Sequence, residues 1–188
     1  MSGPTAHATT RYRGRFAPSP TGPLHFGSLV AALASYCDAR KAQGQWLVRI
    51  EDVDEPRSRP GSEREILAAL DRCGFIIDDP VVRQSERTPR YEAALQSLAN
   101  AGLVYPCYCS RRDLEAVPVN AIGERVYPGT CRHDAAPTTR TPAWRVRVNA
   151  TTLRYVDGTQ GPQEQDLARD VGDFIVRRAD GLFAYQLA

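Results

Sequence analysis

The chain has 188 residues, 42% of them hydrophobic and 24% charged, which is typical of a soluble globular domain with or without a small insertion. The formal net charge of +2 does not by itself indicate a nucleic-acid-binding protein. No apolar run approaches the roughly 18 residues that a membrane span needs. We expect a cytoplasmic protein, in which five cysteines argue against a disulfide framework.

The first half of the chain has the pattern of an α/β protein. Residues 1–10 are small and polar, lack the apolar stretch of a secretory signal, and predict a disordered tail. Residues 11–16 read as a strand, and residues 17–23, with three prolines and a glycine, as a stiff loop. A helix from about Gly27 to Ala42 and an apolar strand from Trp46 to Ile50 follow. This order predicts a Rossmann-like, doubly wound parallel sheet.

Two more helices follow the second strand. Ser62 is the expected N-cap of a helix from Glu63 to Cys73, with Glu65 completing a capping box. A third helix is expected from about Thr88 to Ala101. Cys73 and Cys37, which lies in the first helix, occupy apolar positions, and we expect both to be small buried residues.

The second half changes character. Residues 104–141 are rich in cysteine and proline and read as an insertion between residues 11–103 and 142–188 of the Rossmann-like domain. Strands are expected over residues 143–148 and 152–156. A final hairpin is expected, with Phe174–Arg178 and Leu182–Ala188 as its strands.

The loop and helix at residues 15–28 have the features of a phosphate site. The loop leaves a strand at its carboxyl end, where α/β sheets place ligands. It leads to His25, Gly27 and Ser28 at the start of a helix, where free N–H groups and the helix dipole favour anions. His25 can donate a hydrogen bond to a phosphate oxygen, and Gly27 permits close approach of a nucleotide.

An acidic run follows the second strand. Residues 51–54 carry three carboxylates, which need cationic neighbours, and Arg49 and Arg57 are available for that structural role. The functional interpretation is that Glu51 receives the α-ammonium group of an amino acid. Arg15, at the end of the neighbouring strand, would then bind a side-chain carboxylate through two hydrogen bonds.

The insertion contains a candidate zinc site. Cys107 and Cys109 can face one point, and Cys131 supplies a third thiolate. The fourth ligand is open between His133 and Tyr127. Chemistry alone favours His133, because imidazole is the commoner ligand. We expect a structural role for this metal.

The run Arg-Phe-Ala-Pro-Ser-Pro-Thr-Gly at residues 15–22, followed by His-Phe-Gly-Ser at 25–28, resembles the glutamate and glutamine branch of the class I aminoacyl-tRNA synthetases. The resemblance implies that His25, Gly27 and Ser28 bind ATP, with Mg²⁺, and form the catalytic centre. It also implies glutamate contacts from the following residues: Arg15, Phe16, Ala17, Pro18, Ser19, Glu51 and Tyr185. It favours Tyr127 over His133 as the fourth zinc ligand, because the family has Cys-x-Cys followed by Tyr-x-x-x-Cys.

Residues 57–61, 127–131 and 173–188 look more like the short glutamyl-Q type than like full glutamyl-tRNA synthetases. That likeness implies activation of glutamate without tRNA, transfer to the queuosine of tRNA(Asp), and a monomer with no membrane partner.

The sequence departs from the family in one respect. Lys41 is the only lysine, so the lysine-containing second signature loop is not present, and we expect the catalytic domain to be incomplete at its C-terminus. Losing such an electrostatic group typically lowers the rate by about 10²–10³-fold, so we expect low activity from this chain by itself. The alternatives are an N-terminal fragment of a glutamyl-tRNA synthetase and a truncated, non-catalytic paralogue.

Overall fold

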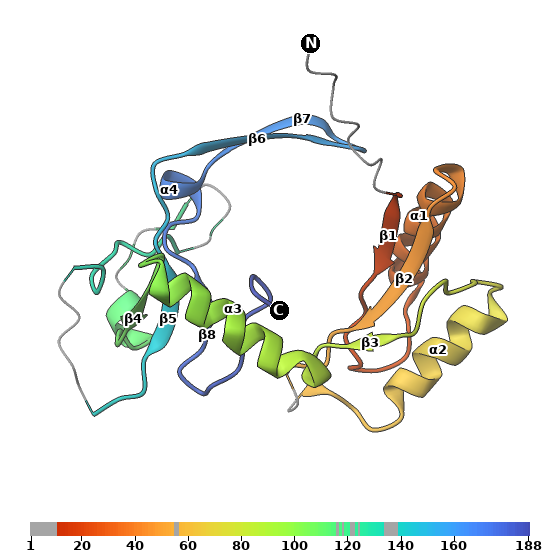
Figure 1. The fold of residues 1–188 in the computed structure, drawn as a ribbon, viewed down its shortest axis with the longest axis horizontal. Coiled ribbons are helices and arrows are strands. Elements are labelled where there is room, and N and C mark those ends of the chain that lie inside the picture. The colour runs from red at the N-terminus through yellow and green to blue at the C-terminus, as the bar shows by residue number, and fades with distance from the viewer. Residues whose placement is uncertain are drawn as a thin grey trace, which may run out of the picture. The chain divides into compact units, whose positions relative to one another are not determined.

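The computed structural model describes residues 11–54, 57–115, 117, 119–120, 123, 125–133 and 139–188. The chain divides into two compact units, Met1–Thr88 and Pro89–Ala188 (Figure 1). The tail expected at residues 1–10 lies outside the described residues. The domain boundaries expected near residues 103 and 141 stay predictions.

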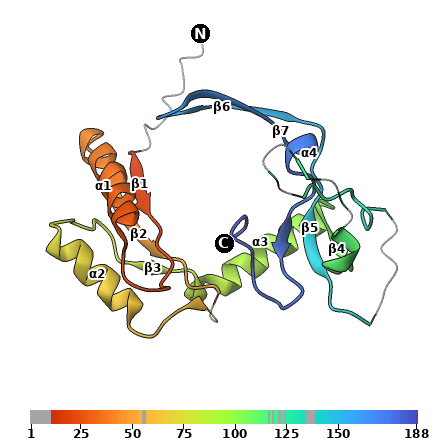
Figure 2. The ribbon, with the colours of Figure 1, turned by 180° about the vertical axis from the view of Figure 1, so that it is seen from behind.

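The first unit is built on a parallel sheet of three strands in the order β1-β2-β3. The strands are β1 (Arg13–Phe16), β2 (Gln45–Ile50) and β3 (Val82–Arg83). Helix α1 (Phe26–Lys41) connects β1 to β2, and α2 (Ser62–Arg72) connects β2 to β3 (Figure 2). A short 3₁₀ helix, η2 (Ser85–Arg87), follows β3. The predicted parallel α/β sheet is confirmed.

Both helices cover the same face of this sheet. Residues on that face belong to one buried cluster with residues of both helices: Phe16, Trp46, Val48 and Ile50 from the strands, Ala32 and Ala39 from α1, and Ile66 and Leu70 from α2. The opposite face carries the exposed Arg15 and the half-buried Leu47 and Arg49. Winding on both faces therefore stays a prediction, and the second face carries charged groups, Arg15 and Arg49.

The second unit contains an antiparallel sheet in the order β4-β5-β8. Its strands are β4 (Val104–Cys107), β5 (Ala143–Val146) and β8 (Ile175–Arg177). Helix α3 (Thr88–Asn100), whose first residue closes the first unit, contributes Tyr91, and its ring lies 5.6 Å from that of Phe183. A 3₁₀ helix, η3 (Arg112–Leu114), follows β4.

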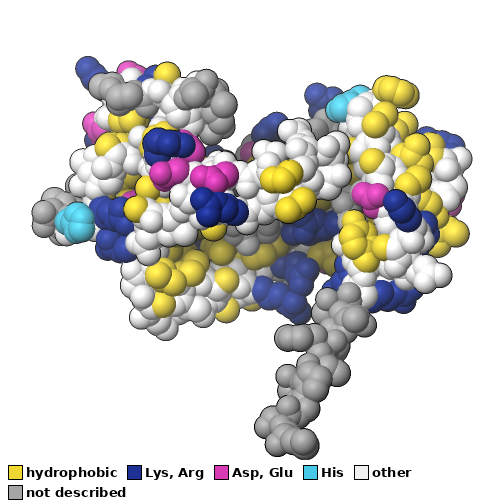
Figure 3. Space-filling view, turned by 90° about the horizontal axis from the view of Figure 1, so that it is seen from above, with side chains coloured by type: hydrophobic (Ala, Val, Ile, Leu, Met, Phe, Trp, Pro, Cys, Tyr) yellow, Lys and Arg dark blue, Asp and Glu magenta, His cyan; other side chains and the backbone are white. Residues whose placement is uncertain are grey.

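A two-stranded ribbon, β6 (Thr152–Asp157) with β7 (Gly161–Asp166), extends from this sheet, and helix α4 (Leu167–Asp170) follows it. Both strands are largely solvent-exposed, including Tyr155 and Val156. On the face of the molecule seen from above in Figure 1, apolar side chains and charged side chains of both signs are mixed (Figure 3).

Three local expectations for the helices are wrong. Gly61, not Ser62, is the N-cap of α2: its φ of 84° lies in the left-handed region that glycine favours, and Ser62 is buried as the first helical residue. Cys37 and Cys73 are exposed. Helix α1 is apolar on most of its surface, so the sequence pattern did not reveal which face Cys37 occupies. Cys73 is the C-cap of α2, at the exposed end of that helix.

The strand assignments after β5 are partly wrong. Residues 182–188 do not form a strand, and their isolated β-bridge is between Phe183 and Arg177. The chain then turns, and the Leu187 N–H donates a hydrogen bond to the carbonyl of Ala184. Strand β7 was not expected, because Gly-Pro-Gln-Glu-Gln-Asp has no apolar alternation. Backbone pairing with β6 holds β7 in the strand conformation, which its side-chain pattern does not predict.

Candidate functional site

The proline-rich loop after β1 is held by the ends of neighbouring segments. The carbonyl of Pro18 accepts a hydrogen bond from the Glu51 backbone N–H at 3.0 Å, and that of Pro20 accepts one from the Arg59 N–H at 2.8 Å. A cavity of about 430 Å³ opens beside this loop. Its lining is drawn from residues 16–31 and includes Phe16, Ala17, Pro18, Ser19, His25, Gly27 and Ser28.

His25 is the N-cap of α1. Its Nδ1 accepts a hydrogen bond from the Ser28 backbone N–H at 3.3 Å, and its Nε2 lies 3.1 Å from the Ser28 Oγ. Because Nδ1 is the acceptor, the neutral ring carries its proton on Nε2. Both residues therefore sit at the positive end of a 16-residue helix, beside the cavity.

Gly27 leaves room for the His25 ring. A Cβ atom there would lie 3.2 Å from Cε1 and 3.3 Å from Nδ1 of the His25 ring. These are tighter than ordinary contacts, so a side chain would push the imidazole away from the helix start. The predicted trio of His25, Gly27 and Ser28 is thus brought together at one edge of the cavity.

Glu51 follows the end of β2 and is paired with Arg49. Their Oε1 and Nη2 atoms are 2.6 Å apart, and the two side chains are 18% and 20% exposed. The predicted structural partnership of Arg49 with the acidic run is therefore present. One carboxylate oxygen of Glu51 makes this contact, and the other has no ion pair or hydrogen bond among the described residues.

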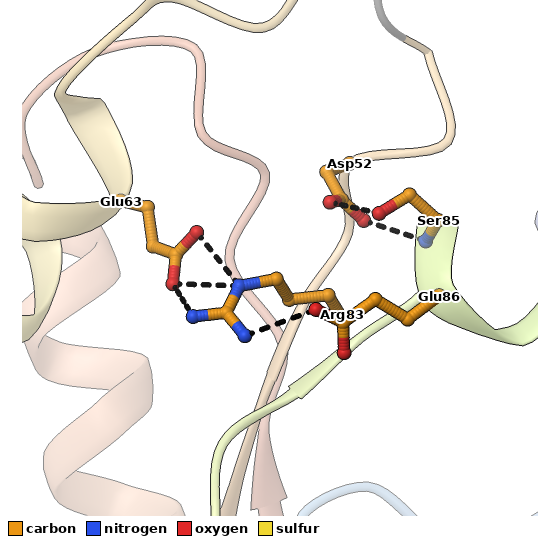
Figure 4. A network of polar contacts seen from close by, with 5 residues as sticks. All are labelled: Asp52, Glu63, Arg83, Ser85 and Glu86. Atoms are coloured by element: carbon orange, nitrogen blue, oxygen red, sulfur yellow. Dashed lines mark hydrogen bonds and ion pairs between the residues drawn. The ribbon is translucent and has the colours of Figure 1, made fainter.

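Asp52, the next residue, binds Ser85 and so holds the loop in place. Its carboxylate accepts hydrogen bonds from the Ser85 N–H at 2.9 Å and from the Ser85 Oγ at 2.6 Å (Figure 4). Nearby, Arg83 binds Glu63 through Nε and Nη2 and reaches Glu86 at 3.2 Å. The Asp52 contacts join the loop after β2, which includes Glu51, to η2, and the Arg83 contacts join β3 to α2 and η2.

The remaining expected glutamate contacts occupy different places. Arg15 is exposed on β1, on the face not covered by the helices, and Ser19 lies in the loop that lines the cavity. Tyr185 belongs to the second unit and is 51% exposed. Its approach to a shared glutamate stays a prediction.

The second unit brings the predicted metal ligands together. The sulfur atoms of Cys107, Cys109 and Cys131 lie within 4.8 Å of one another, and they form the one such group of three found across the described residues. The Tyr127 hydroxyl lies 3.3 Å from the Cys107 sulfur and 3.5 Å from that of Cys109. His133, the alternative fourth ligand, is exposed and lies outside the group.

Burial sets the ionisation of this cluster. It raises the pKa of the Cys109 thiol to about 11 and raises the pKa of the Tyr127 phenol well above its ordinary value. Burial also disfavours the Cys131 thiolate, but hydrogen bonds led by the Tyr108 backbone N–H lower the pKa of Cys131 overall. Without a metal, Cys109 and Tyr127 are therefore neutral at pH 7.

Asp173 is a buried centre that the sequence did not single out. It is 4% exposed, accepts from the Tyr105 hydroxyl at 2.6 Å and the Val148 N–H at 2.7 Å, and lies 3.7 Å from Arg132. Its backbone carbonyl accepts from Arg145 at 2.6 Å. An isolated acidic residue before the apolar run Phe-Ile-Val was the available signal.

Comparison with known proteins identifies the family. Residues 11–188 match the family of class I tRNA synthetases (E and Q), catalytic domain. The chain belongs to this family. Within the synthetase chain, the described helices offer no segment long and apolar enough to cross a membrane.

The synthetase chain is similar to curated proteins named glutamyl-Q tRNA(Asp) synthetase. It is 55% identical to that of Dechloromonas aromatica over 179 residues, which is 94% of this chain and 60% of the relative. It is 56% identical to that of Burkholderia mallei over 186 residues, 95% of this chain and 62% of the relative. The chain thus spans about three-fifths of the length of these relatives.

Solved structures with the same fold include a glutamate tRNA ligase from Elizabethkingia meningosepticum in complex with its amino acid. The TM-score is 0.78 at 27% identity, and the match covers 94% of the synthetase chain and 40% of the ligase. The glutamate-tRNA synthetase of Elizabethkingia anophelis matches equally well, with a TM-score of 0.78 at 26% identity.

Proposed function

We propose that this chain supplies the ATP- and glutamate-binding part of a glutamyl-Q tRNA(Asp) synthetase. The observation that carries the proposal is the His25, Gly27 and Ser28 helix start beside a cavity at the carboxyl end of β1. Identities of 52–56% to relatives of that name support the choice of substrate. We expect the protein to act in the cytoplasm.

The proposed reaction has two steps. A carboxylate oxygen of glutamate attacks the α-phosphorus of ATP, the bond from that phosphorus to the bridging oxygen breaks, and glutamyl-adenylate and pyrophosphate form. This activation does not need tRNA. The glutamyl group then passes to the queuosine of tRNA(Asp), and AMP is released.

Catalysis in this scheme is positioning and charge stabilisation, and no side chain is modified. The start of α1, with His25 and Ser28, holds the phosphates of ATP, which binds with Mg²⁺. Phe16, Ala17, Pro18 and Ser19 border the glutamate, as does Tyr185. Arg15 binds the side-chain carboxylate, and Glu51 binds the α-ammonium group through the oxygen that Arg49 leaves free. Glutamine would lose the charge-assisted pair of hydrogen bonds that the Arg15 guanidinium makes with a carboxylate, which accounts for specificity.

The cysteine cluster of the second unit is a structural zinc centre in this proposal, with Cys107, Cys109, Cys131 and Tyr127 as its ligands. Three sulfur atoms converging within 4.8 Å are a donor set that suits zinc. Bound zinc would cross-link the segment after β4 to the segment around residue 131, where few apolar side chains hold the chain together.

Calorimetry with stable analogues of glutamyl- and glutaminyl-adenylate tests the glutamate site. We expect the chain to bind the glutamyl analogue more tightly, and Arg15→Gln to weaken that binding by about 10- to 100-fold and abolish the preference. Arg13→Gln is the matched control, because Arg13 lies on the same face of β1 and contacts Asp79 at 3.7 Å. No preference for the acidic analogue in the unmodified chain would refute the proposal.

A second function is favoured by the structural neighbours, which are glutamate tRNA ligases. In that case the acceptor would be tRNA(Glu). Charging assays with tRNA(Glu) and with queuosine-bearing tRNA(Asp), using a protein of the relatives' full length, distinguish the two, since only one acceptor should receive labelled glutamate.

A further inference from the structure

Arg145 is the cation that lies against the proposed metal centre. It is on β5, is 7% exposed, and its guanidinium carbon lies 3.8 Å from the centre of the Tyr127 ring. One of its terminal nitrogens donates to the Asp173 carbonyl at 2.6 Å. The guanidinium is thus fixed on one face of a ring whose hydroxyl points among the cysteine sulfurs.

The second unit has other arginine–ring contacts, but they do not involve a proposed ligand. Arg147 lies 4.7 Å from the Tyr105 ring, whose hydroxyl donates to Asp173. Arg177 lies 5.3 Å from the Phe183 ring, away from the sulfurs. Stacking of a permanent cation on a ligand side chain therefore distinguishes Arg145 among the described arginines.

Charge gives this contact a consequence for metal binding. Three thiolates and a tyrosine oxygen around Zn²⁺ leave a centre with net negative charge, which is costly in a buried site unless a cation is near. Arginine is always protonated, and its flat guanidinium can stack on an aromatic face at short range. A lysine ammonium at this position would keep the charge but lose the stacking surface.

We propose that Arg145 is a positioning residue of the metal centre, which holds the Tyr127 oxygen against the three sulfurs and supplies a counter-charge to the loaded site. This inference rests on the zinc centre proposed above. It extends that centre from its four ligands to the sheet, because Arg145 is anchored to the backbone of Asp173 and so links the metal to β5 and the segment before β8.

The test compares metal binding by the chelator-stripped 188-residue chain and its variants. Zn²⁺ affinity is measured by competition with a chromophoric chelator, and Co²⁺ is used as a spectroscopic substitute. We expect Arg145→Gln to lower Zn²⁺ affinity by about 10- to 100-fold and to shift the Co²⁺ d–d bands, as loss of an outer partner does. Arg145→Lys should restore part of the affinity. Arg177→Gln is the matched control and should match the unmodified chain.

The possible results distinguish a failure of the Arg145 role from a failure of the zinc centre itself. If Arg145→Gln binds Zn²⁺ like the unmodified chain with unchanged Co²⁺ bands, Arg145 has no positioning role. Equal losses in Arg145→Gln and Arg177→Gln would also overturn it, since the effect would then be general destabilisation. If Arg145→Gln does not fold, Arg145→Lys decides: normal Co²⁺ bands and affinity overturn the role, and a shift supports it. An unmodified chain that binds neither metal removes the centre itself and leaves the glutamate site unaffected.

Discussion

Replacement of Asp173 by asparagine tests how the second unit is held together. The aspartate uses both carboxylate oxygens: Oδ2 accepts from the Tyr105 hydroxyl at 2.6 Å, and Oδ1 accepts from the Val148 N–H at 2.7 Å. An asparagine has one acceptor oxygen and one NH₂ group. Whichever way the amide is turned, one of its sides must therefore change from an acceptor to a donor.

The cost follows from these two contacts. In the less costly orientation the amide oxygen stays with the Val148 N–H and the NH₂ group faces the Tyr105 hydroxyl, whose own proton then has no acceptor in a site that is 4% exposed. A buried group left without its partner costs about 1–3 kcal/mol, and replacing a charged acceptor by a neutral one costs about 1 kcal/mol more. We expect the free energy of unfolding to fall by about 2–4 kcal/mol, a large share of the roughly 5–15 kcal/mol typical of a domain.

Amide hydrogen exchange and urea unfolding measure this loss. The Val148 amide should exchange at least about 20-fold faster in Asp173→Asn, because each 1.4 kcal/mol corresponds to about a factor of ten. Asp180→Asn is the control: Asp180 also accepts hydrogen bonds, but at an exposed turn. If the two variants unfold at the same urea concentration with equal Val148 exchange, Asp173 does not organise this unit.

Two further results are expected. Gly44→Ala should lower the stability of the first unit by about 2–4 kcal/mol in urea unfolding, because its Cβ would collide with the Tyr12 carbonyl, which accepts the hydrogen bond that begins β2. Gly158→Ala, with open space around it, should be nearly neutral, and a similar loss in both would contradict the collision. The metal-free chain should lose stability as pH rises from 9 to about 11, because the folded state holds Cys109 protonated while the unfolded thiol ionises. Cys109→Ser should flatten that fall in pH-dependent unfolding, and an unchanged pH profile would contradict it.

Local chemistry made much of the candidate site predictable. The prolines after β1 exclude a helix, so the start of α1 at His25 and Gly27 follows from a few adjacent residues. Cys107 and Cys109 are likewise close in sequence, Cys131 was expected as the third thiolate, and Tyr127 was expected from the family pattern. The structure brings these four side chains into contact.

What the sequence did not reveal depends on distant pairing. Asp173 meets Tyr105 across 68 positions, and Arg145 meets Tyr127 only because β5 returns beside β4. Strand β7 has no alternation of apolar and polar residues, and it is held in place by pairing with β6. Cys37 was misplaced because a helix with apolar residues all around it gives no periodic signal.

We expect the β6–β7 ribbon to behave as a semi-independent hairpin. Every rung of its ladder joins residues on either side of one short turn at Asp157–Gly161, and water reaches both of its surfaces. A lone two-stranded hairpin is only marginally stable, so this element should fray and re-form without disturbing β4, β5 and β8. We therefore expect substitutions and added residues at the tip to be tolerated, because the hydrogen bonds given for its turn among the described residues stay within the ribbon.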